Sequence, residues 1–353
     1  MTATLARSLA GWPRTELHLH LDGSILIETA IELAASRGVD APLDRDGMRA
    51  VLVAPERCGS QAELLRAFEL PIALLQDAEA LERVARELVE AKALDGVRYL
   101  EIRWGPLLHL GRGLGLAEGI AAVCAGASDG ARAASAAGRP IVVRLIATAL
   151  RSHEPAANTR LATVAATFRD RGLVGWDLAG DEARYPDPTI HRRAFDEARG
   201  GGLRITCHAG EWGGPQQVRR ALELEPERIA HGSVAIDDRA LCAELATRAI
   251  ALDLCPTSNV QAGLARSVAD HPLARLHRAG VRVTLSTDDL TVSDVTLSEE
   301  YERAIDRIGL TAGELWAIDR GALDVAFAEA EVLEPLRADF DRWAAIRAPS
   351  VTG

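Results

Sequence analysis

Two histidines, His18 and His20, stand two positions apart in a short apolar run near the N-terminus. Alternate residues of an extended strand point to the same face, so both imidazoles can reach one metal ion while Leu19 packs the other way. Two polar histidines on the solvent face of a strand would give the same pattern. The metal interpretation therefore depends on whether other parts of the chain supply more ligands.

Further ligands and acids follow other short apolar runs. They lie in residues 177–182, 208–211, 231–233, 255–259 and 286–289. Four of the nine histidines, His18, His20, His208 and His231, stand at such positions, and Asp288 and Asp289 join them. Ordinary hydrogen bonding explains one such histidine well, but four histidines with paired carboxylates indicate a catalytic site.

The donor set favours zinc. Imidazoles with a carboxylate suit Zn²⁺, whereas Mg²⁺ and Ca²⁺ prefer more oxygen ligands and structural zinc sites more often use thiolates. The segment after the fourth apolar run carries Asp177 and Asp181 and no lysine. A lysine-bridged two-metal centre is therefore less favoured, and we predict one catalytic Zn²⁺ per chain.

Eight runs of strand length alternate with helix-like segments, and these elements must position the candidate groups. After the run around His18, they cover residues 97–104, 141–150, 173–178, 203–208, 228–231, 251–255 and 281–286. Their hydrophobicity is continuous, as in parallel strands buried on both faces. We predict the α/β class, a parallel (β/α)8 TIM-type barrel with its functional groups at the carboxyl ends of the strands. Without a linker or low-complexity tract, residues 1–353 are expected to form a single barrel domain.

A helical insertion is predicted after the first strand, over residues 47–76. Leu64, Leu65, Phe68 and Ile72 form a stripe there at helical spacing. Such a stripe is typical of core packing, and an insertion at this place could also form a lid.

Local signals predict further details of single elements. Ser24 is a candidate N-cap for the helix after the first strand, and Gly38 is placed to end that helix. Glu101 and Arg103 share one face of the second strand, which favours a buried ion pair between them.

The eighth strand must break at the Asp288–Asp289 pair. Adjacent residues of a regular strand point to opposite faces, so both carboxylates reach one site only where the strand turns into its loop. We therefore predict that this strand ends at about Thr287.

Composition limits the partners. The 353 residues carry 40 Lys and Arg against 51 Asp and Glu, a net charge of −11, which disfavours nucleic acid and anionic membrane surfaces. The five cysteines are scattered, with no Cys-x-x-Cys pair, and are expected to be free thiols in a reducing cytoplasm. We expect no signal peptide or membrane span. The oligomeric state is not indicated.

Five motifs together resemble those of the adenosine deaminase family of metal-dependent hydrolases. They are His18-Leu19-His20-Leu21-Asp22-Gly23, Asp177-Leu178-Ala179-Gly180-Asp181-Glu182, His208-Ala209-Gly210-Glu211, Cys255-Pro256-Thr257-Ser258-Asn259 and Ser286-Thr287-Asp288-Asp289. They follow the family's order. Each motif alone is weakly specific, but the joint signal is strong.

The resemblance implies zinc-dependent hydrolytic deamination of adenosine, or of a closely related 6-aminopurine nucleoside, to the inosine-type product and ammonia. The implied zinc ligands are His18, His20, His208 and Asp288. The implied catalytic groups are Glu211 as proton shuttle, with His231 and Asp289 holding the attacking water. The implied substrate contacts are Asp22 to the ribose 5′-hydroxyl, Gly180 to the purine ring, and a purine lid around Leu64, Leu65 and Phe68. We also expect His20 to line the substrate pocket.

The chemistry explains why an acid is needed. Zinc lowers the pKa of a coordinated water from ~15.7 toward ~7, which provides hydroxide at neutral pH. Attack on C6 breaks the aromaticity of an aminopurine, so N1 must be protonated as the bond forms. Glu211 follows His208 by three residues, and Gly210 permits a tight turn between them. On the residues alone, Glu211 could instead be a surface carboxylate, Asp289 a helix cap and Gly180 only a turn glycine.

One departure and several alternatives remain open. Leu290 stands where the family commonly has proline, which leaves the loop over the ligand less restricted. Asp22, where deaminases of free adenine usually have glutamate, favours a nucleoside, and its charge disfavours a 5′-phosphate. Deamination of adenine or of a 5′- or N6-modified adenosine, another mononuclear zinc hydrolase, and an adenosine-binding protein without turnover are the alternatives. The His-x-Glu and Pro-Cys-x-x-Cys signature of cytidine-type deaminases is absent.

Overall fold

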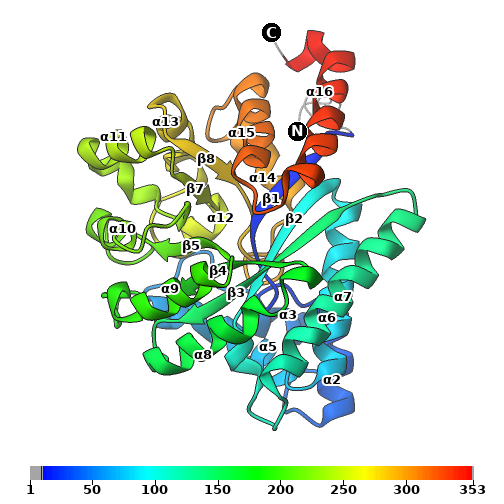
Figure 1. Cartoon of the computed structure of the whole chain (residues 1–353). Helices are drawn as coiled ribbons and strands as arrows, with labels where there is room; N and C mark the ends of the chain where they lie inside the picture. The colour runs from blue at the N-terminus through cyan, green and yellow to red at the C-terminus, as the bar shows by residue number, and fades with distance from the viewer. Residues whose placement is uncertain (1–8, 10, 352–353) are drawn as a thin grey trace.

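Eight parallel strands form the centre of the computed structural model, which describes residue 9 and residues 11–351 (Figure 1). The strands are β1 (Arg14–His20), β2 (Val97–Trp104), β3 (Val142–Leu150), β4 (Leu173–Ala179), β5 (Arg204–Ala209), β6 (Arg228–His231), β7 (Ala251–Leu254) and β8 (Arg282–Leu285). Each strand pairs with the next in sequence, and a bridge between Leu19 and Asp288 brings the chain after β8 back to β1. The predicted TIM-type barrel is confirmed, with its closure almost complete.

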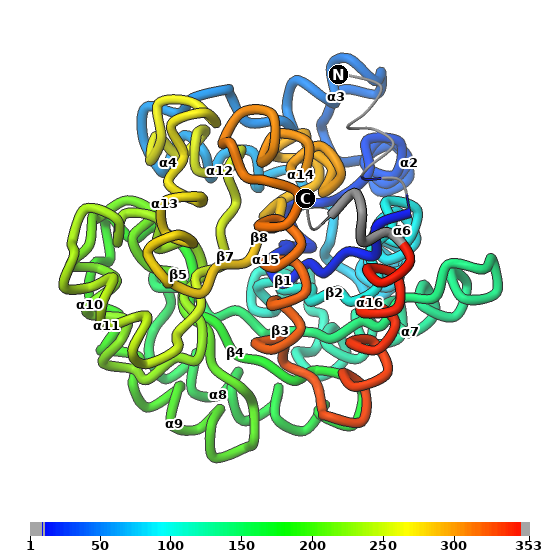
Figure 2. Tube along the Cα trace, turned by 90° about the horizontal axis from the view of Figure 1, so that it is seen from above, coloured from blue at the N-terminus to red at the C-terminus, as the bar shows by residue number. Residues whose placement is uncertain are grey.

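Helices surround the strands, as the view from above shows (Figure 2). After β2 they are α7 (Leu116–Ala136), α8 (Pro155–Ala166), α9 (Arg192–Gly200), α10 (Pro215–Leu222), α11 (Arg239–Arg248), α12 (Pro256–Gln261), α13 (Leu273–Arg278), α14 (Leu297–Asp306), α15 (Ala312–Val325) and α16 (Ala330–Val351). Trp12, just before β1, contacts the rings of Trp316 on α15 and Trp343 on α16. The last two helices therefore pack beside the start of the barrel.

The connection between β1 and β2 contains the predicted helical insertion. Its helices are α2 (Ile27–Arg37), α3 (Arg45–Leu52), α4 (Gln61–Leu65), a 3₁₀ turn at Arg66–Phe68, α5 (Glu69–Leu74) and α6 (Ala78–Leu94). Asp77 caps α6 by accepting a hydrogen bond from the backbone of Ala80 at 2.8 Å, and Gly38 ends α2 in the left-handed conformation as predicted.

The predicted Ser24 cap is wrong. Helix α2 begins at Ile27, after Leu26, which provides no side-chain cap. The Ser24 hydroxyl instead accepts a hydrogen bond from the backbone N–H of Leu290 at 3.0 Å. This contact joins the loop after β1 to the loop after β8, and a proline at position 290 could not donate it.

The predicted Glu101–Arg103 pair is also wrong, although both side chains are fully buried. Glu101 pairs with Arg228 of β6, and Arg103 contacts Asp177 of β4 at 3.2 Å. Side chains two positions apart on a strand extend in parallel into the barrel, so their partners come from strands across the interior. The barrel centre is thus a network of buried, mutually compensated charges.

The described helices are all too short or too polar to span a lipid bilayer. The five cysteines lie within the described residues, and each is buried without a disulfide partner.

Candidate metal centre and active site

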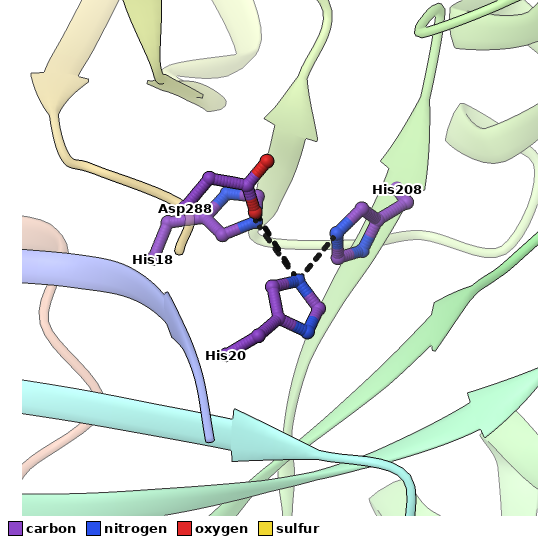
Figure 3. A group of neighbouring side chains, drawn as sticks. All are labelled: His18, His20, His208 and Asp288. Carbon is purple, nitrogen blue, oxygen red and sulfur yellow. Dashed lines mark hydrogen bonds and ion pairs between the residues drawn. The ribbon is translucent and has the colours of Figure 1, made fainter. Parts of the chain in front are cut away.

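Three imidazoles and one carboxylate meet where the strands end (Figure 3). The Nε2 atom of His20 lies 3.3 Å from Nε2 of His18 and 3.1 Å from Nε2 of His208. The Oδ1 atom of Asp288 lies 3.0 Å from His18 Nε2 and 3.4 Å from His20 Nε2. Tetrahedral zinc with ligand distances of about 2.0–2.1 Å separates its ligand atoms by about 3.3 Å. The four predicted metal ligands therefore fit one zinc ion.

Burial keeps the imidazoles available as ligands. Removal from water lowers the pKa of His18 well below its usual value and that of His20 to about 3. Neutral imidazoles carry the free lone pairs that a metal ion requires. The pKa of the Asp288 carboxyl is also low, because the neighbouring histidines His18 and His231 outweigh the opposite effect of burial.

The chain turns sharply to bring Asp288 into the site. Strand β8 ends at Leu285, two residues before the predicted end. Asp288 adopts a left-handed backbone with φ of 68°, and its N–H donates to the carbonyl of His18 at 3.1 Å. The predicted break in the strand is present, and the backbone of β1 holds it.

A second layer of polar groups orients two of the candidate ligands. The Nδ1 atom of His208 lies 2.8 Å from a carboxylate oxygen of Asp177, which in turn contacts Arg103. The Ser258 hydroxyl donates to Oδ2 of Asp288 at 2.6 Å. Such contacts fix a ligand's orientation and the tautomer of a histidine.

Glu211 lies beside this group as an acid that keeps its proton. Burial, with a smaller contribution from the charge of Asp288, raises the pKa of Glu211 to about 8. Gly210 adopts φ of 73° in the preceding turn. Glu182 holds the turn, because its carboxylate accepts hydrogen bonds from the backbone of Gly210, Glu211 and Trp212 at 2.8–2.9 Å. Glu211 can therefore donate a proton at neutral pH.

His231 and Asp289 complete the polar side of the site. The Nε2 atom of His231 lies 3.7 Å from Glu211 and 3.8 Å from Asp288, and burial lowers the pKa of this histidine. Asp289 is buried, with Oδ1 lacking a hydrogen-bond partner, and burial together with Asp288 raises the pKa of its carboxyl well above the usual value. Gly23 leaves room for this carboxyl, because a Cβ at position 23 would lie 1.8 Å from Asp289 Oδ1.

A cavity of about 250 Å³ opens onto these groups. The sequence-predicted residues that line it are His20, Asp22, Leu64, Leu65, Phe68, Gly180, His208, Glu211, His231, Asp288 and Asp289. Leu64 and Phe68 come from α4 and the 3₁₀ turn after it, so the insertion forms one wall of the cavity. His18 lies behind the lining, as a fully buried ligand. The structure thus brings every predicted site residue together.

Several polar partners in the site were not recognised in the sequence. Gln61 of α4 donates to a carboxylate oxygen of Glu211 at 3.2 Å. His109 lies 2.6 Å from Asp22, whose pKa it lowers against the effect of burial. His271 contacts Asn259, which contacts His231. Gln61, His109 and His271 stand outside the strand-end motifs, so no short-range pattern marks them.

Comparisons with known proteins place this site in a family. A family model described as adenosine deaminase matches residues 13–343. An adenosine deaminase from Mycobacterium sp. (strain JLS) is 40% identical over 329 residues, covering 89% of this chain and 90% of the relative.

Two solved structures are similar along the chain. An amidohydrolase from Burkholderia ambifaria with bound zinc superposes with a TM-score of 0.89 at 26% identity, covering 100% of this chain and 96% of that chain. An N6-mAMP deaminase from Arabidopsis superposes with a TM-score of 0.83 at 31% identity, covering 94% and 98%. The family match, the identity and the converging ligands lead to one conclusion: the chain belongs to the adenosine deaminase family.

Proposed function

We propose that this protein hydrolytically deaminates adenosine, or a closely related 6-aminopurine nucleoside, to the inosine-type product and ammonia. The observation that carries the proposal is the position of Glu211, whose pKa is raised to about 8, beside a cluster of three imidazoles and a carboxylate. The mycobacterial relative named adenosine deaminase supports the same reaction.

One zinc ion per chain would be held by His18, His20, His208 and Asp288. When bound, zinc supplies the Lewis acidity that makes water nucleophilic at neutral pH. The solved Burkholderia relative contains zinc, and the ligand spacing in this chain suits the same ion.

The remaining residues handle protons and position the substrate. Glu211 donates its proton to N1 of the purine as C6 becomes tetrahedral, which avoids a negative charge on the ring. His231 and Asp289 hold the attacking water. Leu64 and Phe68 cover the apolar faces of the purine, and Gly180 offers a backbone contact to its edge.

Asp22 favours a nucleoside over a nucleotide. Its carboxylate lines the cavity and is held by His109 and by the backbone N–H of Gly105 at 3.0 Å. A fixed carboxylate can accept a hydrogen bond from a ribose 5′-hydroxyl but repels a 5′-phosphate. The described residues lining the cavity include no lysine or arginine to neutralise a phosphate.

A panel of amines tests the proposal. Formation of the 6-oxopurine product is followed, because every member of the panel releases ammonia except N6-methyladenosine, which releases methylamine. We expect kcat/KM for adenosine and 2′-deoxyadenosine to be at least about 10-fold above that for adenine, N6-methyladenosine and adenosine 5′-monophosphate. Fastest turnover of a nucleotide would indicate an activity like that of the Arabidopsis relative. No 6-oxopurine product from any member of the panel would contradict a deaminase.

A further inference from the structure

A line of three buried polar side chains runs from the candidate active site into the protein. His231 Nδ1 lies 3.0 Å from Asn259 Nδ2, and Asn259 Oδ1 lies 3.0 Å from His271 Nε2. At the far end, the backbone N–H of Leu273 donates to His271 Nδ1 at 3.3 Å. His231 ends β6, Asn259 lies on α12, and His271 stands just before α13. All three side chains are at least 97% buried, so solvent does not compete for these contacts.

The backbone fixes the direction of every hydrogen bond in this line. The N–H of Leu273 is a donor only, so His271 Nδ1 must be an acceptor. The proton of neutral His271 is therefore on Nε2, and that N–H donates to the oxygen of the Asn259 amide. The amide nitrogen of Asn259 then faces His231 and donates to its Nδ1.

Other protonation patterns place two donors against each other. A flipped Asn259 amide would direct its NH₂ group at the Nε2–H of His271. A doubly protonated His231 would direct an Nδ1–H at the Asn259 amide nitrogen, 3.0 Å away. Burial lowers the pKa of His271 to about 3, consistent with a neutral ring at the end of the line. One tautomer of His231 satisfies every contact: neutral, with its proton on Nε2.

We propose that Asn259 and His271 are positioning residues that hold His231 with Nε2–H directed into the active site, where it acts as a hydrogen-bond donor to the attacking water. This inference rests on the proposed function. The Nε2 atom faces Glu211 and Asp288, as a group that orients the water between them would. His231 in this tautomer cannot accept a proton at Nε2, so its role is to orient the water and not to deprotonate it.

The first test reads the tautomer directly. The zinc-loaded protein is labelled with ¹⁵N-histidine, and the ring signals of His231 are assigned by their loss in His231→Gln. At pH 7 we expect one protonated nitrogen in His231, Nε2, and the same tautomer in His271. A proton on Nδ1 of His231 would overturn the proposal.

The second test reverses the direction of the hydrogen bond between residue 259 and His231. In Asn259→Asp, the carboxylate accepts from His271 and from His231, which forces the proton of His231 onto Nδ1. We expect kcat for adenosine to fall about 10- to 100-fold, with KM changed by less than about 3-fold. An unchanged His231 tautomer or an unchanged kcat in this variant would refute the assignment.

A conservative variant and a control variant complete the comparison. His271→Gln is the conservative replacement of a positioning residue: its side-chain N–H can still donate to Asn259, so we expect His231 to keep its proton on Nε2. His277→Gln changes a histidine of α13 outside this line and should alter neither reading. A tautomer change in His277→Gln, or loss of the Nε2–H tautomer in His271→Gln, would contradict the proposed hydrogen-bonded line.

The two proposals fail in different ways. A wild-type protein that releases no ammonia from adenosine removes the proposed function, while the nitrogen spectra still report the tautomer. An active wild-type protein with His231 protonated on Nδ1 removes only this inference. If circular dichroism shows that Asn259→Asp is unfolded, the nitrogen spectra of wild type and His271→Gln still decide which tautomer His231 adopts.

Discussion

At the scale of single residues, neighbouring charges divide the carboxyl groups of the site into two kinds. Asp288 and Asp177 lie against histidines or Arg103 and ionise readily, as indicated by their lowered pKa values. For Glu211, burial outweighs the compensation from His208, and Asp289 has no such partner, so the pKa values of both carboxyls are raised. Neighbouring carboxyl groups whose pKa values are shifted in opposite directions are typical of acid–base catalysis. The ionised groups can bind a cation while the protonated groups supply protons.

Glu211 is the residue whose loss should affect the chemistry most. In Glu211→Gln the side chain keeps its size but cannot transfer a proton to N1, so we expect kcat to fall by about 10²- to 10⁴-fold. Zinc content should remain unchanged by elemental analysis, because Glu211 is not a proposed ligand. Glu223→Gln, at the end of α10, is a surface control. Full activity of Glu211→Gln would remove Glu211 from the mechanism.

Asp22 should decide how much the sugar contributes. Without its carboxylate, Asp22→Ala loses the proposed contact to the 5′-hydroxyl but no group that touches the purine. We expect KM for adenosine to rise about 10-fold or more, and KM for 5′-deoxyadenosine to change by less than about 3-fold. Steady-state kinetics with both substrates makes the comparison. Equal changes for the two substrates would refute the ribose assignment.

At the scale of elements, the insertion after β1 is coupled to the acid it covers. Leu64 packs in a small apolar cluster with Ala262 and Val292, which follow β7 and β8. Gln61 of the same helix, α4, donates to Glu211 and to the carbonyl of Gly180 at 3.3 Å. The position of α4 and the orientation of Glu211 therefore depend on each other.

Removal of the Gln61 amide tests this coupling. Gln61→Ala loses hydrogen bonds to Glu211 and Gly180, each worth about 0.5–1.5 kcal/mol. We expect kcat/KM for adenosine to fall roughly 5- to 150-fold, which is the range that the two bonds together give. Arg66→Ala, with its exposed side chain in the adjoining 3₁₀ turn, should retain wild-type kinetics. Wild-type kinetics in Gln61→Ala as well would show that the contact contributes nothing to turnover.

At the scale of the whole molecule, strand positions were predictable and long-range pairings were not. Continuous apolar runs locate all eight strands, and for β2 and β6 the predicted first and last residues agree with the structure. The convergence of the metal ligands was also predictable, because the carboxyl ends of parallel strands lie at one rim of the barrel. The partners of Glu101 and Arg103 depend on the stagger across the barrel, which no local pattern encodes. The His231–Asn259–His271 line likewise joins elements whose packing only the folded chain defines. A single domain over residues 1–353 stays a prediction.

The buried carboxyl of Glu300 on α14 links the stability of the barrel to pH. Its Oε1 accepts a hydrogen bond from the backbone of Thr257 at 2.8 Å, while Oε2 has no partner. Burial raises the pKa of Glu300 to about 7, so the folded protein keeps this group neutral in mildly acidic solution. In Glu300→Gln, the amide oxygen can keep the bond to Thr257 without carrying a titratable group.

The sign of the effect follows from proton binding. Between about pH 4.5 and pH 7 the unfolded chain has lost the Glu300 proton and the folded chain retains it, so the free energy of unfolding falls as pH rises. Below this window the neutral carboxyl contributes its full stability, and above it the contribution is lost. Relative to Glu300→Gln, wild type should lose up to about 3 kcal/mol between pH 4.5 and pH 7.5. Urea unfolding of both proteins across this range measures the difference in the free energy of unfolding. The other titrating groups contribute equally in both proteins, so their effects cancel in this difference. A difference independent of pH would show that Glu300 is already ionised in the folded state.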